Sequence, residues 1–206
     1  MKEKTYAETA DILKKLEIGG ITEELTERLG KQFAELPPEI TFSKAAAFLT
    51  DLGERNVSAV NAEQKAAGYG VYSFDMEVFD MDSMYTRFLQ GVSSLDAAEL
   101  DFRDIKEDLS GVDLDEGTGK RTVSFEWKGR LRVLEAEAMQ DWFDMKAAAA
   151  LNEIIAAQNT GKRLYFLSDG YQECIVFYRD EEWAKAFCRE TGLPLADGIS
   201  QGQRFV

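Results

Sequence analysis

The stretch that decides the fold is 162–194, KRLYFLSDGYQECIVFYRDEEWAKAFCRETGLP. It contains two apolar runs, 164–167 and 174–178. Between these runs stands the pair Asp169-Gly170, and an Asp-Gly pair flanked by apolar segments is typical of a β-hairpin. The stretch therefore predicts two antiparallel strands joined by a short turn.

A helix is expected directly after this hairpin. Asp180 has the short polar side chain that an N-cap requires, and two glutamates follow it in the positively polarised first turn. Gly192 and Pro194 predict where the helix ends. A soluble domain with both strands and helices follows from this unit.

Farther from this unit, at the N-terminus, three segments repeat apolar residues at helical spacing. The first ends at Gly19-Gly20, the second runs from an N-cap at Thr22 to Pro37-Pro38, and the third runs from Ser43 to Gly53. We expect these helices to pack on the rest of the protein.

The remaining segments predict strands and two more helices. Apolar and polar residues alternate in 69–79 and in 123–127, as in half-buried strands. Ile105 breaks the alternation of a further strand and predicts a bulge there, and a register change is expected near Val133-Leu134. The fold class is α+β: N-terminal helices followed by a mostly antiparallel sheet, in the order β-α-β-β-β-α-β-β-α, with helices packed on one face.

The predicted organisation has four parts. They are an N-terminal helical segment (1–53), a connector (54–68), an α+β sheet domain (69–195) and a polar tail (196–206).

Composition restricts the chemistry. The chain has 206 residues, no histidine and two cysteines. Histidine is the commonest general base and metal ligand, so its absence excludes histidine-dependent hydrolase triads and histidine-containing zinc sites. Two cysteines make no disulfide framework, and we expect both to act as small buried hydrophobic residues. No cofactor is expected.

The formal net charge of −14 is concentrated in one region, because 75–116 holds 13 acidic and 3 basic residues. Nucleic acid and anionic membranes are disfavoured as partners, since both require cationic contacts. A basic protein partner is favoured. No apolar run is long enough for a membrane span or a secretion signal, so we expect a cytoplasmic protein.

The acidic side chains of this region have two interpretations. They serve as a docking face for a cationic protein, or they only keep the protein soluble. Trp142, between two predicted elements, and Tyr171, at the hairpin turn, are the aromatic residues with the best prospects of exposure. The candidate partner-binding residues are thus Asp101, Asp104, Asp108, Asp113, Asp115, Glu116, Trp142 and Tyr171.

A metal-dependent enzyme is an alternative. The pairs Asp75/Glu77 and Asp80/Asp82 resemble carboxylate pairs that hold Mg²⁺ or Ca²⁺, although a solvated strand face and a helix start have the same composition. The segment 113–120 matches neither an EF-hand loop nor a phosphate-binding P-loop, because required glycine, glutamate or hydroxyl positions differ.

The last third of the chain, from Asp141-Trp142 through the hairpin to TGLPL, resembles the immunity proteins that bacteria encode beside polymorphic toxins. The resemblance lies in an acidic α+β domain with a helix opening at W-x-D, a hairpin centred on Asp-Gly and a closing helix. It implies a non-catalytic protein that binds one toxin and masks it, and it carries over no catalytic residue.

We therefore expect a non-catalytic cytosolic binding protein, of the immunity-inhibitor kind, that docks an acidic face on a basic partner. The metal-dependent enzyme and a ligand-sensing module with an apolar pocket are the alternatives. The sequence leaves the oligomeric state open.

Overall fold

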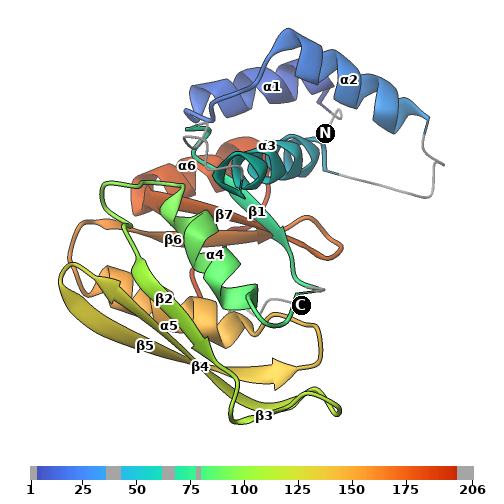
Figure 1. The fold of residues 1–206 in the computed structure, drawn as a ribbon. Coiled ribbons are helices and arrows are strands. Elements are labelled where there is room, and N and C mark those ends of the chain that lie inside the picture. The colour runs from blue at the N-terminus through green and yellow to red at the C-terminus, as the bar shows by residue number, and fades with distance from the viewer. Residues whose placement is uncertain (1–3, 36–42, 62–67, 78–79, 199–206) are drawn as a thin grey trace.

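The computed structural model describes residues 4–35, 43–61, 68–77 and 80–198. It confirms an α+β fold with N-terminal helices and antiparallel strands (Figure 1). The strands form two separate sheets where the sequence suggested one. The predicted helix stop at Pro37-Pro38, residues 62–67 of the predicted connector and residues 199–206 of the predicted tail lie outside the described residues.

The first sheet has three strands in the order β1-β7-β6, with bounds Tyr72–Asp75, Glu173–Asp180 and Lys162–Ser168. The predicted hairpin is confirmed as β6 and β7, paired in register from Lys162 opposite Asp180 to Ser168 opposite Cys174. Helix α6, Glu181–Thr191, begins where Asp180 accepts a hydrogen bond from the Trp183 amide at 2.8 Å. It ends at Gly192, whose φ of 77° belongs to the left-handed region.

Helices cover both faces of this sheet, not one. Alternate side chains of β6 and β7 pack on one side against α4, Met84–Ser93, and α5, Met145–Ala156. The others pack against α1, Tyr6–Lys15, against α3, Lys44–Asn61, and against α6. The reason is visible in the sequence, because continuous apolar runs are typical of strands buried on both faces.

The second sheet is built around β4, Thr118–Trp127. On one side β4 pairs with β2, Arg103–Asp108, and with the short β3, Val112–Asp113; on the other it pairs with β5, Arg130–Met139. One face of this sheet packs against α4 and α5, so these helices lie between the two sheets (Figure 1). The other face is open to solvent.

The two predicted irregularities had different outcomes. The bulge near Ile105 is confirmed, since the register between β2 and β4 shifts between Arg103 and Lys106. The register change near Val133-Leu134 is wrong, because β4 and β5 pair without interruption. Leu131 and Val133 simply face solvent on the open side of the sheet.

The N-terminal helices share their apolar core with the first sheet and α6. Helix α2, Glu23–Ala34, packs on α1 and α3 at the outer side of this layer (Figure 1). Helix α3 continues past Gly53, where the sequence suggested its end. A Cβ added at Gly53 would lie 2.4 Å from the Ser73 amide nitrogen, so the glycine permits close packing on β1.

The first residues of the predicted tail are fixed on the sheet. Ala196 and Phe166 exchange backbone hydrogen bonds of 2.7 and 2.9 Å, and the Asp197 side chain is buried. No helix in the described part of the chain has both the length and the hydropathy that crossing a bilayer requires.

Candidate protein-binding surface

The acidic segment does not present all its carboxylates to solvent. Lys162 lies 3.2 Å from Asp96 and 3.5 Å from Glu99, and Arg103 lies 2.5 Å from Asp101. These three carboxylates share two of the protein's own cations, which lowers their value for attracting a partner.

Glu107 is a structural residue. Its carboxylate lies 3.1 Å from Arg121, and both side chains are at most 3% exposed. The other oxygen accepts a 2.6 Å hydrogen bond from the amide of Thr86 in the first turn of α4. Because Ser83 makes no side-chain cap at this helix, Glu107 supplies the missing acceptor from the neighbouring strand.

Asp113, Asp115 and Glu116 form the turn between β3 and β4. One oxygen of Asp113 accepts hydrogen bonds of 3.1 Å from the amides of both Asp115 and Glu116, which orders the turn. All three residues are exposed. Leu114, between them, is 54% exposed.

This turn lies beside the end of β5 and beside Trp142. Their proximity was not apparent from the sequence. Asp113, Thr118 and Met139 are paired side by side across β3, β4 and β5. Trp142 then pairs with Met139, and its amide donates to the Met139 carbonyl at 3.1 Å. The predicted exposure of Trp142 is confirmed at 40%.

The hairpin turn of the first sheet continues the same surface. Trp142 also forms a β-bridge with Glu77, and the side-chain amide of Gln172 donates to the Glu77 carboxylate. The Met76 amide donates to the Gln172 carbonyl at 2.9 Å. Tyr171, next to Gln172, is 58% exposed.

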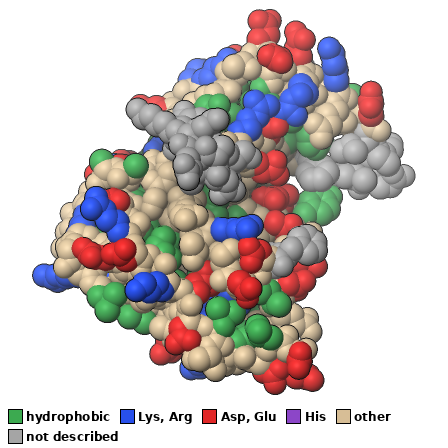
Figure 2. Space-filling model, viewed as in Figure 1, with side chains coloured by type: hydrophobic (Ala, Val, Ile, Leu, Met, Phe, Trp, Pro, Cys, Tyr) green, Lys and Arg blue, Asp and Glu red, His purple; other side chains and the backbone are tan. Residues whose placement is uncertain are grey.

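We call the surface formed by 75–77, 113–119, 139–145 and 168–173 the docking end. These four segments contain no lysine or arginine. Figure 2 shows acidic side chains, with hydrophobic ones among them, along the right-hand and lower margins of the view. The acidic residues of the four segments are Asp75, Glu77, Asp113, Asp115, Glu116, Asp141, Asp144, Asp169 and Glu173.

The predicted partner-binding residues are therefore only partly brought together. Asp113, Asp115, Glu116, Trp142 and Tyr171 belong to the docking end. Asp101 and Asp104 lie toward the opposite end of β4, because Arg103 pairs with Glu126 there, and Asp108 lies between the two ends, opposite Thr122.

The four residues of the metal alternative are engaged locally. Asp75 accepts a hydrogen bond from the Glu77 amide at 2.9 Å. Asp80 forms an ion pair with Arg87 at 2.5 Å, and Asp82, the other residue of the second proposed pair, is exposed. Strand β1 ends at Asp75, so Asp75 and Glu77 do not share a strand face. Within the described ranges no three histidine, cysteine, aspartate or glutamate side chains are grouped as a metal site.

Glu173 is the most perturbed carboxyl group of the docking end. It lies opposite Asp75 in the pairing of β1 with β7. Burial, followed by the charges of Glu54, Asp75 and Asp169, raises the pKa of Glu173 from 4.5 to about 7. Carboxylates from three separate parts of the chain are thus close enough to repel one another.

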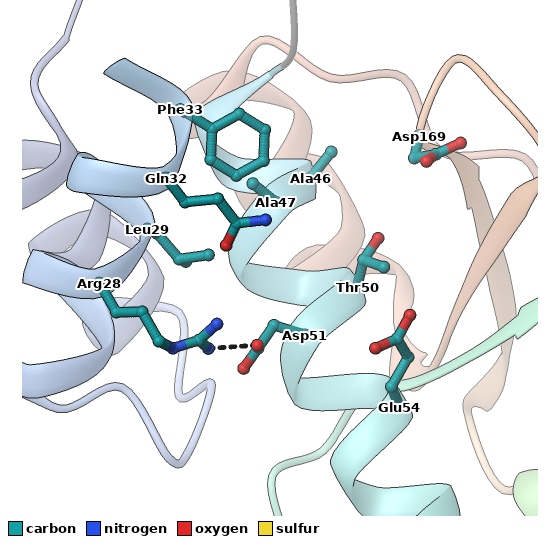
Figure 3. Close-up of a pocket in the computed structure, with 10 residues that line it drawn as sticks. All are labelled: Arg28, Leu29, Gln32, Phe33, Ala46, Ala47, Thr50, Asp51, Glu54 and Asp169. Carbon is teal, nitrogen blue, oxygen red and sulfur yellow. Dashed lines mark hydrogen bonds and ion pairs between the residues drawn. The ribbon is translucent and has the colours of Figure 1, made fainter. Parts of the chain in front are cut away.

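A cavity of 280 Å³ lies between α2 and α3, beside the hairpin turn that carries Asp169 (Figure 3). Its walls include Leu29, Phe33, Ala46 and Ala47.

The two cysteines are free thiols and form no disulfide. Cys174 is buried, which raises the pKa of its thiol and makes it a poor nucleophile.

Two residues of the docking end had no predicted role in partner binding. Met139 closes a strand, and Glu77 was a candidate metal ligand only, so nothing in the sequence indicated that they are neighbours of Trp142. Only the pairing of the strands shows that they meet.

Comparison with protein-family models, with curated proteins and with solved structures returned no match.

Proposed function

We propose that this protein is a non-catalytic binding protein that docks its acidic end on a basic surface of a protein partner. The observation that carries the proposal is the composition of the docking end. Nine acidic residues and no basic ones come together there from four separate segments. Two of the nine contribute least to this surface: Asp144 is a buried helix cap, and Glu173 is partly buried.

Exposed apolar side chains lie among these carboxylates. Leu114, Met139, Trp142 and Tyr171 are between 40% and 58% exposed. Binding energy in protein interfaces is concentrated in a few apolar or aromatic anchors, and surrounding charges mainly accelerate association and select the partner. The docking end supplies both components, which favours an interface over a surface that only improves solubility.

The more specific proposal is an immunity-type inhibitor of the cytoplasm that covers the working surface of a basic toxin domain. It is supported by the acidic docking end and by the resemblance of the last third of the chain. Inhibition would be steric, so no residue of this chain would act on a substrate.

The proposal is tested by capture from lysates of the cells that encode the chain, at low salt, with a matched pair of variants. The docking variant combines Asp113→Asn, Asp115→Asn, Glu116→Gln and Trp142→Ala. Asparagine at 113 keeps the acceptor that orders the turn. The control variant changes three exposed glutamates on α5 and α6, Glu153→Gln, Glu182→Gln and Glu190→Gln, and so removes the same charge elsewhere.

The wild type and the control variant are expected to retain the same basic protein, and the docking variant is expected to lose it. Retention should weaken with added salt, because screening reduces attraction between exposed charges. Equal retention by the docking variant, or loss by both variants alike, would contradict binding through the docking end.

A further inference from the structure

The cavity between α2 and α3 combines apolar walls with a charged opening. Leu29 and Phe33 from α2 face Ala46 and Ala47 from α3 across it. Thr50 and Glu54, one and two turns farther along α3, lie toward the hairpin turn of Asp169 (Figure 3). A ligand with an aliphatic part and a polar head would fit this division of the lining.

The charges around the opening do not balance. Arg28 lines the cavity, but it forms an ion pair with Asp51, which also pairs with Arg55 at 2.8 Å. Glu54 and Asp169 have no cationic partner in the part of the chain that the structure describes. Two carboxylates therefore remain uncompensated beside an apolar cavity.

The surroundings of Glu54 make its charge costly. Burial and the nearby charge of Asp51 raise the pKa of Glu54 above its ordinary value. One buried oxygen atom of the lining, the Thr50 hydroxyl, makes no hydrogen bond in the described structure. A bound cation with N–H donors would relieve the repulsion and supply the hydrogen bond that the Thr50 hydroxyl lacks.

We propose that this cavity binds a small organic cation, an alkylammonium or alkylguanidinium ion. The charged head lies at Glu54, on the side facing Asp169, and the aliphatic stem packs against Leu29 and Phe33. The cavity volume of 280 Å³ suits a ligand of a few carbon atoms. This site is separate from binding of a protein partner and shares only Asp169 with the docking end.

Isothermal titration calorimetry with n-butylguanidinium tests the proposal, with n-butanol as a neutral probe of the same stem. The purified full chain is expected to bind n-butylguanidinium saturably at one site and to bind n-butanol at least about tenfold more weakly. Glu54→Gln keeps the shape of the side chain. It is expected to weaken the binding of n-butylguanidinium roughly fivefold, the factor that corresponds to about 1 kcal/mol of Coulomb energy.

Glu153→Gln on α5 is the matched control, because it removes one exposed charge on the other side of the first sheet. It should leave the affinity unchanged. Equal affinity for n-butanol, equal effects of the two substitutions, or no saturable binding at millimolar concentration would each overturn the proposal. None of these results bears on capture of a protein partner, so the two proposals fail independently.

Discussion

At the scale of single residues, the structure uses some of its charges for cohesion. Glu107 and Arg121 form a buried ion pair, Arg121 donates to the Met81 carbonyl at 2.5 Å, and its guanidinium lies 5.3 Å from the ring centre of Tyr85. The sequence predicted an acidic strand, which contains Glu107, and an alternating strand next to Arg121. It could not show that these two charged side chains meet inside the protein.

Removing one partner of this pair is expected to cost far more than removing an exposed charge. Arg121→Met leaves Glu107 buried without a cation, and the free energy of unfolding should fall by about 3 to 5 kcal/mol in urea denaturation. Lys120→Met, on the opposite face of the same strand, breaks only an exposed contact of 3.9 Å and should change it by less than about 1 kcal/mol. Equal effects would contradict the buried pair.

Glu173 predicts a dependence of stability on pH. Its pKa is raised from 4.5 to about 7, so between these values the folded protein holds a proton that the unfolded chain releases. The free energy of unfolding should therefore fall as the pH rises through this window.

The variant Glu173→Gln isolates that contribution. It should match the wild type below the window and be more stable by roughly 1 kcal/mol above it, a value discounted because the group is partly exposed to solvent. Urea denaturation across the pH range measures the free energy of unfolding of the wild type and of Glu173→Gln. A wild type whose stability relative to Glu173→Gln rises with pH would contradict the assignment.

At the scale of elements, two helical glycines make opposite predictions. A Cβ added at Gly91 in α4 would lie 2.2 Å from the ring of the buried Tyr72, whereas at Gly30 in α2 the nearest atom is 3.8 Å away. Gly91→Ala should destabilise by about 1 to 3 kcal/mol through overpacking. Gly30→Ala should stabilise by about 0.5 to 1 kcal/mol through helix propensity. Thermal unfolding distinguishes them, and equal signs would contradict the packing.

Two helix caps are expected to contribute different amounts to the free energy of unfolding. Asp180 accepts one amide, from its own helix, so Asp180→Ala should cost about 1 kcal/mol. Asp144 is buried and accepts the amides of Lys146 and of Glu137 in the neighbouring strand, so Asp144→Ala should cost about 2 to 3 kcal/mol. Equal losses in urea denaturation would show that the second hydrogen bond contributes little.

The elements themselves were largely predictable, because their signals are local. Thr22 and Asp180 cap the helices that the sequence assigned to them, and the hairpin turn carries its glycine at a φ of 94°. The division into two sheets was not predictable, since it depends on which strands meet after α4 and α5. The continuous apolar runs of β6 and β7 did hold the clue that helices cover both faces.

At the scale of the whole molecule, charge density along the sequence proved an incomplete guide to charge density in space. The acidic segment loses Asp96, Glu99, Asp101 and Glu107 to internal ion pairs. The docking end instead gains Asp141, Asp169 and Glu173 from distant segments. The predicted acidic residues and exposed aromatic residues therefore meet only in part, and their role in binding a partner stays a prediction.

The most direct test of the docking end is hydrogen–deuterium exchange of the full chain with and without its captured partner. Binding through the docking end should slow exchange in 113–119, 139–143 and 169–173 and leave exchange in α5 and α6 unchanged. Protection confined to the open face around Leu131 and Val133, or to α1 and α2, would contradict it.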